Sequence, residues 1–251
     1  MTAAVAAVLL SVAGTGARAD DVFVSGRLDR VSSPSGVGGG GGVEWNHAAS
    51  PHQTLSLGFS GYALPGTKWV TGRGATTASF GRTSVTADLM GGHSSVEGGF
   101  YQIGGGVSHP LGSPRLVGDA ECHYLGGTSA RGTLAKAGLT FSPRPSLILQ
   151  GGYYQSFGGT LGSRLGAAKM VYIAGRWRYL VGGSLGRSSP TVFGFVDQQQ
   201  TQTVRHAFAG ATLPLPAGGE LTIVLEHYDL DVTNRSLLSL IWKIAHGLKG
   251  H

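Results

Sequence analysis

Apolar residues alternate with small or polar residues through most of the chain. Leu55, Leu57 and Phe59 are separated by serine and glycine, and the segments around Leu139 and Leu240 repeat the pattern. A period of two is that of a β-strand with two different faces, because successive side chains point to opposite sides of a sheet. The chain is therefore predicted to be all-β.

Turn residues separate the alternating segments: Pro65-Gly66, Pro143 to Pro145, Pro216 to Gly219 and Thr233-Asn234 each lie between two of them. About twelve strands are predicted, within a range of ten to fourteen. They lie near 36–48, 52–64, 67–80, 82–92, 96–109, 114–125, 132–142, 145–157, 166–187, 200–213, 219–231 and 234–246. Residues 21–31 are a further candidate strand, and 166–187 is a candidate hairpin that turns at Gly175-Arg176.

Two architectures produce this pattern, a soluble β-sandwich and a transmembrane β-barrel. A soluble sheet needs charged side chains on its outer face, whereas the polar positions here are mainly glycine, serine and threonine and only 13% of residues are charged. Strands cross a bilayer only in a closed sheet that satisfies every backbone group. We therefore predict a closed antiparallel up-and-down transmembrane β-barrel over residues 20–251. A secreted β-sandwich binding module is the alternative.

Aromatic residues lie near the ends of many predicted strands, which is typical of side chains at a membrane interface. This set comprises Trp45, Tyr62, Trp69, Tyr101, Tyr124, Phe141, Tyr153, Trp177 and Trp242. The glycine content, 44 of 251 residues without a G-x-y repeat, suits strongly curved strands and a crowded interior.

The N-terminal residues have the pattern of a secretory signal. An apolar run over residues 3–12 precedes Ala17-Arg18-Ala19, an A-x-A cleavage pattern, although Met1-Thr2, before the apolar run, carries no Lys or Arg. Residues 1–19 are therefore predicted to be a signal peptide, and the bacterial outer membrane is the expected location of residues 20–251.

Charge and cysteine content argue against several classes. The formal net charge is +6, but the basic residues are scattered singly, so no nucleic-acid partner is expected. Cys122 is the single cysteine, no Cys/His spacing suits zinc, and no metal or organic cofactor is indicated. The expected partners are outer-membrane lipids and, for an export role, periplasmic or export-system proteins.

Single charges recur at the polar positions of the predicted strands. The set is Glu44, Arg73, Asp88, Asp119, Glu121, His123, Lys136, Arg176, Arg178, Arg205, Glu226 and Lys243. Asp119, Glu121 and His123 share one face of one strand, and Lys136 lies on the next. Mixed signs favour a salt-bridge network that fills a narrow lumen. A selectivity ring or a catalytic pair of carboxylates is the functional alternative.

One short motif suggests chemistry. His93 and Ser95 resemble the His-x-Ser pair of outer-membrane phospholipase A and of the lipid A deacylases, in which histidine is the base and serine the nucleophile. Glu97 follows at the same parity, so the three residues could serve as nucleophile, base and orienting acid. The asparagine that follows the serine in the phospholipase is replaced by Val96.

Residues 20–251 resemble bacterial outer-membrane β-barrels, and the order of segments is similar to that of YaiO-type barrels. The stretches that carry this resemblance are Phe59 to Tyr62, Val107 to Leu111, and Arg176 to Tyr179 followed by Gly182 to Arg187. It implies a role beside glycosyltransferases or in surface-polysaccharide export. We expect a narrow channel or the outer-membrane component of an envelope or polysaccharide export system. An outer-membrane lipid hydrolase or deacylase is the enzymatic alternative.

Overall fold

The computed structural model describes residues 20–32, 35–96, 98–128, 131–159, 161–188, 202–231 and 233–246. These residues form fourteen strands and one 3-10 helix, η2 (Pro216–Gly218). The strands are β1 (Asp20–Ser32), β2 (Ser35–Ser50), β3 (Gln53–Leu64), β4 (Thr67–Phe80), β5 (Thr83–Ser94), β6 (Gly98–Pro110), β7 (Leu116–Gly127), β8 (Gly132–Arg144), β9 (Leu147–Phe157), β10 (Arg164–Ala174), β11 (Trp177–Ser188), β12 (Gln202–Pro214), β13 (Glu220–Leu230) and β14 (Asn234–His246).

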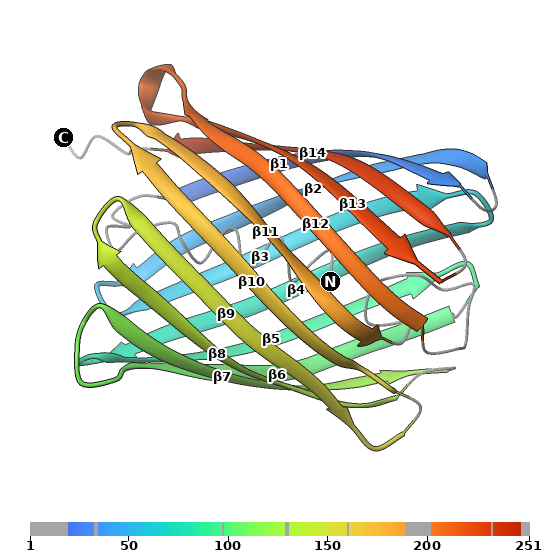
Figure 1. The fold of residues 1–251 in the computed structure, drawn as a ribbon, viewed down its shortest axis with the longest axis horizontal. Coiled ribbons are helices and arrows are strands. Elements are labelled where there is room, and N and C mark those ends of the chain that lie inside the picture. The colour runs from blue at the N-terminus through green and yellow to red at the C-terminus, as the bar shows by residue number, and fades with distance from the viewer. Residues whose placement is uncertain are drawn as a thin grey trace.

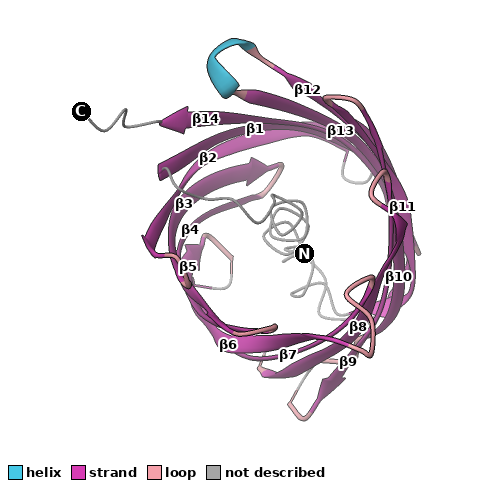
Figure 2. Ribbon diagram, turned by 90° about the vertical axis from the view of Figure 1, so that its left-hand side faces the viewer, coloured by secondary structure: helices cyan, strands magenta, loops and turns pink. Residues whose placement is uncertain are grey.

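The strands close into a single barrel, as the two ribbon views show (Figures 1 and 2). Each strand pairs antiparallel with the next along the chain, and β1 closes the ring against β14, with Leu28 opposite Leu238. Closure removes the free edges that an open sheet would expose. The β-sandwich alternative is therefore wrong, because one sheet closes on itself.

The strand count is fourteen instead of about twelve. The region 166–187 forms two strands, β10 and β11, that turn at Gly175-Arg176, and residues 20–32 form the additional strand β1. Strand β1 is needed because it pairs with both β2 and β14. Its alternation is weak in the sequence, because the apolar Phe23 and Val31 lie on its inward face and the charged Asp20 and Arg30 lie on its outward face.

The two faces of the wall differ as a membrane barrel requires. Exposed large apolar side chains lie on one parity of each strand, such as Leu57 and Phe59 on β3 and Leu139 and Phe141 on β8. Side chains of the other parity contact one another over intervening strands, as Tyr62 and Asp29 do, and this is favoured on the concave side, where side chains converge. The apolar face therefore points outward, and the polar face lines the barrel.

The two ends of the barrel differ in the length of their connections. The end that holds Asp20 and His246 has short links, the longest being 111–115 and 215–219. The opposite end includes the longest link, residues 189–201. Outer-membrane barrels have short periplasmic turns and longer extracellular loops, so the end with the termini corresponds to the periplasmic side.

Candidate functional site

The inner face of β2 is bare over Gly38, Gly40 and Gly42, and two neighbouring strands use this space. A Cβ atom on Gly40 would lie 2.6 Å from Cδ2 of Tyr62, so the Tyr62 ring lies against the glycine. The Tyr62 hydroxyl on β3 therefore reaches over β2 and donates a hydrogen bond to the Asp29 carboxylate on β1.

Arg235 on β14 completes this cluster. Its guanidinium binds the Asp29 carboxylate and donates a hydrogen bond to the Tyr62 hydroxyl at 3.0 Å. Arg27 lies over the Tyr62 ring, 5.3 Å from its centroid. Arg235 and Asp29 are almost completely buried, with 1% and 2% of their surfaces exposed. Buried charges of this kind are stable only when they are paired and hydrogen-bonded.

A second bridge of the same construction spans β5, β6 and β7. His123 on β7 reaches over Gly104 of β6 and contacts Asp88 on β5, with 2.8 Å between Nε2 and Oδ2. A Cβ atom on Gly104 would lie 2.3 Å from the His123 ring, so only glycine leaves room for it. Gln102 also hydrogen-bonds Asp88. Inward glycines thus allow polar side chains from the two flanking strands to meet.

Lys136 on β8 is the centre of a third group. Its ammonium lies 2.9 Å from Asp119 Oδ2 and 2.7 Å from Glu121 Oε1, both on β7. The ring of Tyr154 on β9 lies on its other side, with 5.9 Å between the nitrogen and the ring centroid. One lysine therefore pairs with two carboxylates and reduces the repulsion between them.

A fourth group is built around His206 on β12. Its Nε2 lies 3.2 Å from Glu226 Oε2, and its ring stacks on Tyr228 at 4.1 Å between centroids. The Tyr228 hydroxyl donates to the same carboxylate oxygen at 3.0 Å, and Ser184 lies 3.5 Å from His206 Nδ1. All four side chains are buried. The arrangement is a packed hydrogen-bond network that holds β11, β12 and β13 together.

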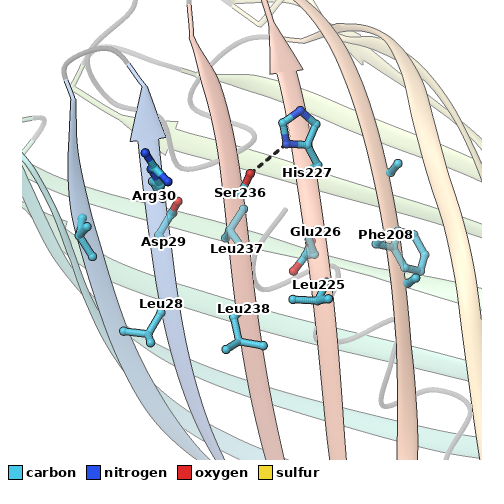
Figure 3. Close-up of a pocket in the computed structure, with 13 residues that line it drawn as sticks. Leu28, Asp29, Arg30, Phe208, Leu225, Glu226, His227, Ser236, Leu237 and Leu238 are labelled. Carbon is cyan, nitrogen blue, oxygen red and sulfur yellow. Dashed lines mark hydrogen bonds between the residues drawn. The ribbon is translucent and has the colours of Figure 1, made fainter.

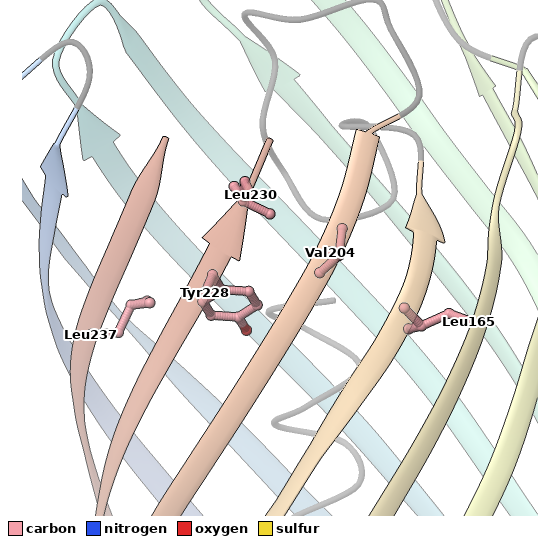
Figure 4. Close-up of a cluster of buried hydrophobic side chains, with 5 residues drawn as sticks. All are labelled: Leu165, Val204, Tyr228, Leu230 and Leu237. Atoms are coloured by element: carbon pink, nitrogen blue, oxygen red, sulfur yellow. The ribbon is translucent and has the colours of Figure 1, made fainter. Parts of the chain in front are cut away.

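The inner wall of β10 to β14 also carries apolar clusters. One contains Leu165, Val204, Tyr228, Leu230 and Leu237, from β10, β12, β13 and β14 (Figure 4). A second contains Val171, Leu180 and Val224. The inner wall of β10 to β14 therefore carries apolar clusters beside polar groups, whereas the buried apolar clusters, among the described residues, do not extend to the wall of β5 to β7, which carries the Asp88 group.

Charge on the inner face is almost balanced. Among the described residues, the inward parity carries eight carboxylates and seven Lys or Arg side chains. The carboxylates are Asp21, Asp29, Glu44, Asp88, Asp119, Glu121, Glu220 and Glu226, and the cations are Arg27, Arg73, Lys136, Lys169, Arg178, Arg235 and Lys243. Further ion pairs join Arg178 to Glu220 and Lys243 to Asp21.

Ten of the twelve side chains expected in the lumen have the inward parity: Glu44, Arg73, Asp88, Asp119, Glu121, His123, Lys136, Arg178, Glu226 and Lys243. Arg73 lies opposite Gly58, which lies opposite Glu44, and Arg73 interacts electrostatically with both Glu44 and Asp88.

The expectation is wrong for Arg176 and Arg205. Arg176 lies in the exposed turn between β10 and β11, outside both strands. Arg205 is on the outward parity of β12, where its exposed guanidinium pairs with Asp229 at 3.1 Å. Two of the aromatic residues expected at the membrane interface, Tyr62 and Trp69, instead face inward and contact each other.

The residues of the His-x-Ser motif do not meet. His93 is exposed on the outward parity of β5, and Ser95 lies in the turn that follows. The Ser95 hydroxyl accepts a hydrogen bond from the Lys68 backbone N–H at 3.0 Å, and none joins it to His93 within the described part of the chain. Glu97 lies outside the described residues. The contact between base and nucleophile that acyl transfer needs is therefore missing.

Several inward residues were not among the side chains expected in the lumen: Asp29, Arg235, Arg27, Lys169, His206 and Glu220. If residues 20–32 are taken as a strand, the alternation of inward and outward positions predicts that Arg27 and Asp29 face the lumen. The five glycines Gly38 to Gly42 were the available signal for Tyr62, since a bare strand face must be covered by its neighbours' side chains.

Among the described residues, no three His, Cys, Asp or Glu side chains gather as a metal site would require. No helix in the described ranges is long and apolar enough to span a membrane.

No protein-family model and no curated protein matches the chain. Several solved structures are similar to this chain in fold. The CymD monoaromatic hydrocarbon channel has a TM-score of 0.64 at 9% identity, over 93% of this chain and 89% of that one. Omp33 of Acinetobacter baumannii has a TM-score of 0.61 at 10% identity, over 90% of this chain and 99% of that one. The Ralstonia pickettii toluene transporter TbuX has a TM-score of 0.57 at 7% identity, over 92% of this chain and 90% of that one.

These likenesses establish the fold. The chain is a closed antiparallel β-barrel of the kind found in bacterial outer-membrane proteins. Its fold and its apolar outer face place it in the bacterial outer membrane.

Proposed function

We propose that the barrel is a narrow outer-membrane channel for small polar solutes. The observation that carries this proposal is the inner wall itself: ionisable and hydroxyl side chains line it and bind one another across strands. Eight-stranded barrels are filled by their own side chains, whereas barrels of roughly 16–18 strands enclose aqueous channels. A barrel of fourteen strands lies between these cases. The near balance of carboxylates and cations predicts weak discrimination between anions and cations.

Single-channel recording in a planar bilayer tests this function, with heat-modifiable gel mobility as the control for folding. Discrete conductance steps are expected, with a reversal potential close to zero across a potassium chloride gradient. A folded barrel that gives no steps, and that passes no small neutral sugar into liposomes, would contradict the proposal.

The apolar inner clusters of β10 to β14 favour a second candidate, passage of small aromatic hydrocarbons. CymD is a monoaromatic hydrocarbon channel, and TbuX is a toluene transporter. Faster uptake of labelled toluene by cells that produce the barrel, without sugar flux into liposomes, would select this candidate over the polar-solute channel.

A third role, export of surface polysaccharide, is supported by the sequence resemblance to YaiO-type barrels. The inward polar face suits contact with a hydroxyl-rich chain. Loss of surface polysaccharide in cells that lack the barrel, restored by the wild-type chain, is the result expected for this role.

A further inference from the structure

A groove lies on the outer surface of the barrel where β12, β13, β14, β1 and β2 run side by side (Figure 3). It is a shallow depression that is open to the outside, with a volume of about 560 Å³. Small residues, Ala207 and Ala209 of β12, form part of it. The outward side chains of the neighbouring strands, such as Leu225 and Leu238, are larger than these alanines, so the outer surface is depressed over β12.

The side chains around the groove are arranged in two rows. Leu28, Leu238 and Leu225 lie opposite one another on β1, β14 and β13 and form an apolar row. The next outward row toward the end away from the termini is polar, with Arg30, Ser236 and His227 on the same three strands. Figure 3 shows the polar row above the leucines. The groove thus spans the boundary between the apolar belt and the polar rim.

The polar row carries unneutralised positive charge. Arg30 is exposed and makes no ion pair within the described part of the chain. His227 is held by a hydrogen bond between Nδ1 and the Ser236 hydroxyl, at 2.9 Å, which leaves Nε2 for a ligand. A cation and an imidazole above an apolar groove match an anionic head group joined to an acyl chain.

The neighbouring outward positions extend this basic surface. Arg164 on β10 and Arg187 on β11 are exposed and lie directly opposite each other, an arrangement of like charges that destabilises a sheet unless an anion joins them. Arg205 follows on β12 but is paired with Asp229. Asp231 is also near, where it accepts a hydrogen bond from the Thr203 backbone N–H. Arg30 and His227 therefore remain the free basic groups beside the groove.

We propose that this groove binds lipid A, the phosphorylated anchor of lipopolysaccharide. One phosphate contacts Arg30 and His227, and one acyl chain lies along Leu28, Leu238 and Leu225 over Ala209. The groove is on the half of the barrel with the longer connections, which corresponds to the outer leaflet, and the outer leaflet of a bacterial outer membrane consists of this phosphorylated glycolipid. The site is on the membrane-facing side and is independent of what passes through the lumen.

Native mass spectrometry of the full chain, refolded without lipid and mixed with diphosphoryl lipid A, tests the site. A one-to-one complex is expected with wild type. The double variant Arg30→Gln/His227→Gln should bind about tenfold more weakly, since charge-assisted contacts to the phosphate are lost. Ala209→Phe, which fills the groove from the lipid side, should have a similar effect while leaving heat-modifiable mobility unchanged.

Two variants serve as matched controls. Arg144→Gln removes an exposed arginine at the end of β8 on the periplasmic side, and Ala137→Phe adds a ring to the outer face of the same strand. Both should bind lipid A as wild type does. Equal binding by all variants, equal loss in the controls, or equal binding of phosphatidylglycerol by wild type would each overturn the proposal.

Discussion

The hydroxyl of Tyr62 on β3 donates a hydrogen bond to the carboxylate of Asp29 on β1, across the full width of β2. This contact exists because β2 presents no side chain between them at Gly38 and Gly40. The same construction joins His123 to Asp88 over Gly104. The high glycine content of the chain thus has a specific structural role at these two strands, which is to let polar side chains cross-link alternate strands on the inner wall.

Replacement of Gly40 by alanine should therefore destabilise the barrel. The new Cβ atom would lie 2.2 Å from the Gly61 carbonyl oxygen and 2.8 Å from the Tyr62 Cα atom, and backbone atoms yield little. We expect a loss of about 1–3 kcal/mol in the free energy of unfolding, measured in urea in the presence of lipid vesicles. Gly26→Ala is the matched control, since nothing lies within 4 Å of a Cβ atom at that outward position. A similar effect of both substitutions would refute the steric explanation.

Tyr62→Phe and Asp29→Asn should be coupled in a double-mutant cycle. Tyr62→Phe alone removes one hydrogen bond to a charged group and is expected to cost about 1.5–3 kcal/mol. Asp29→Asn alone costs more, about 3–5 kcal/mol, because the buried Arg235 guanidinium loses its counter-ion. The double variant should be less destabilised than the sum of the two, since both changes remove the same contact. Strictly additive free energies of unfolding would show that the contact contributes nothing.

Lys136→Gln should make the channel more selective for cations. The substitution leaves Asp119 and Glu121 without the ammonium that lies 2.9 and 2.7 Å from them, so the local charge of the inner wall becomes more negative. In a potassium chloride gradient we expect the reversal potential to move toward the potassium equilibrium potential. Arg176→Gln, in the exposed turn after β10, is the control and should leave the reversal potential unchanged. An unaltered potential in Lys136→Gln would mean that this group does not line the conducting path.

The alternation of side chains was enough to predict the closed barrel and the inward parity of most charged residues. The alternation did not identify every strand or every inward residue, because some positions are determined by pairing between strands and not by the sequence of one strand. Strand β1 has the apolar Phe23 and Val31 on its inner face and the charged Asp20 and Arg30 on its outer face, so its alternation is weak, although it pairs with both β2 and β14 to close the ring. Arg205 was assigned to the wrong face because an alternating pattern does not by itself show which set of positions faces inward. A shift of one residue moves every side chain of the strand to the other face. The bridges over β2 and β6 depend on contacts between strands that are not neighbours, which no single-strand pattern contains.

Leu57→Lys should impair insertion into lipid, whereas Ser56→Lys should be tolerated. Leu57 is an exposed apolar residue close to the middle of β3, and Ser56 is its neighbour on the inner face. A lysine on the lipid-facing side near the bilayer midplane costs about 2–4 kcal/mol, while a lysine inside the barrel is surrounded by polar groups. The folded fraction after insertion into vesicles, read from heat-modifiable gel mobility across a urea series, measures the difference. If Ser56→Lys were the more damaging substitution, β3 would present its other face to the membrane and the inward assignment of Tyr62 would be wrong.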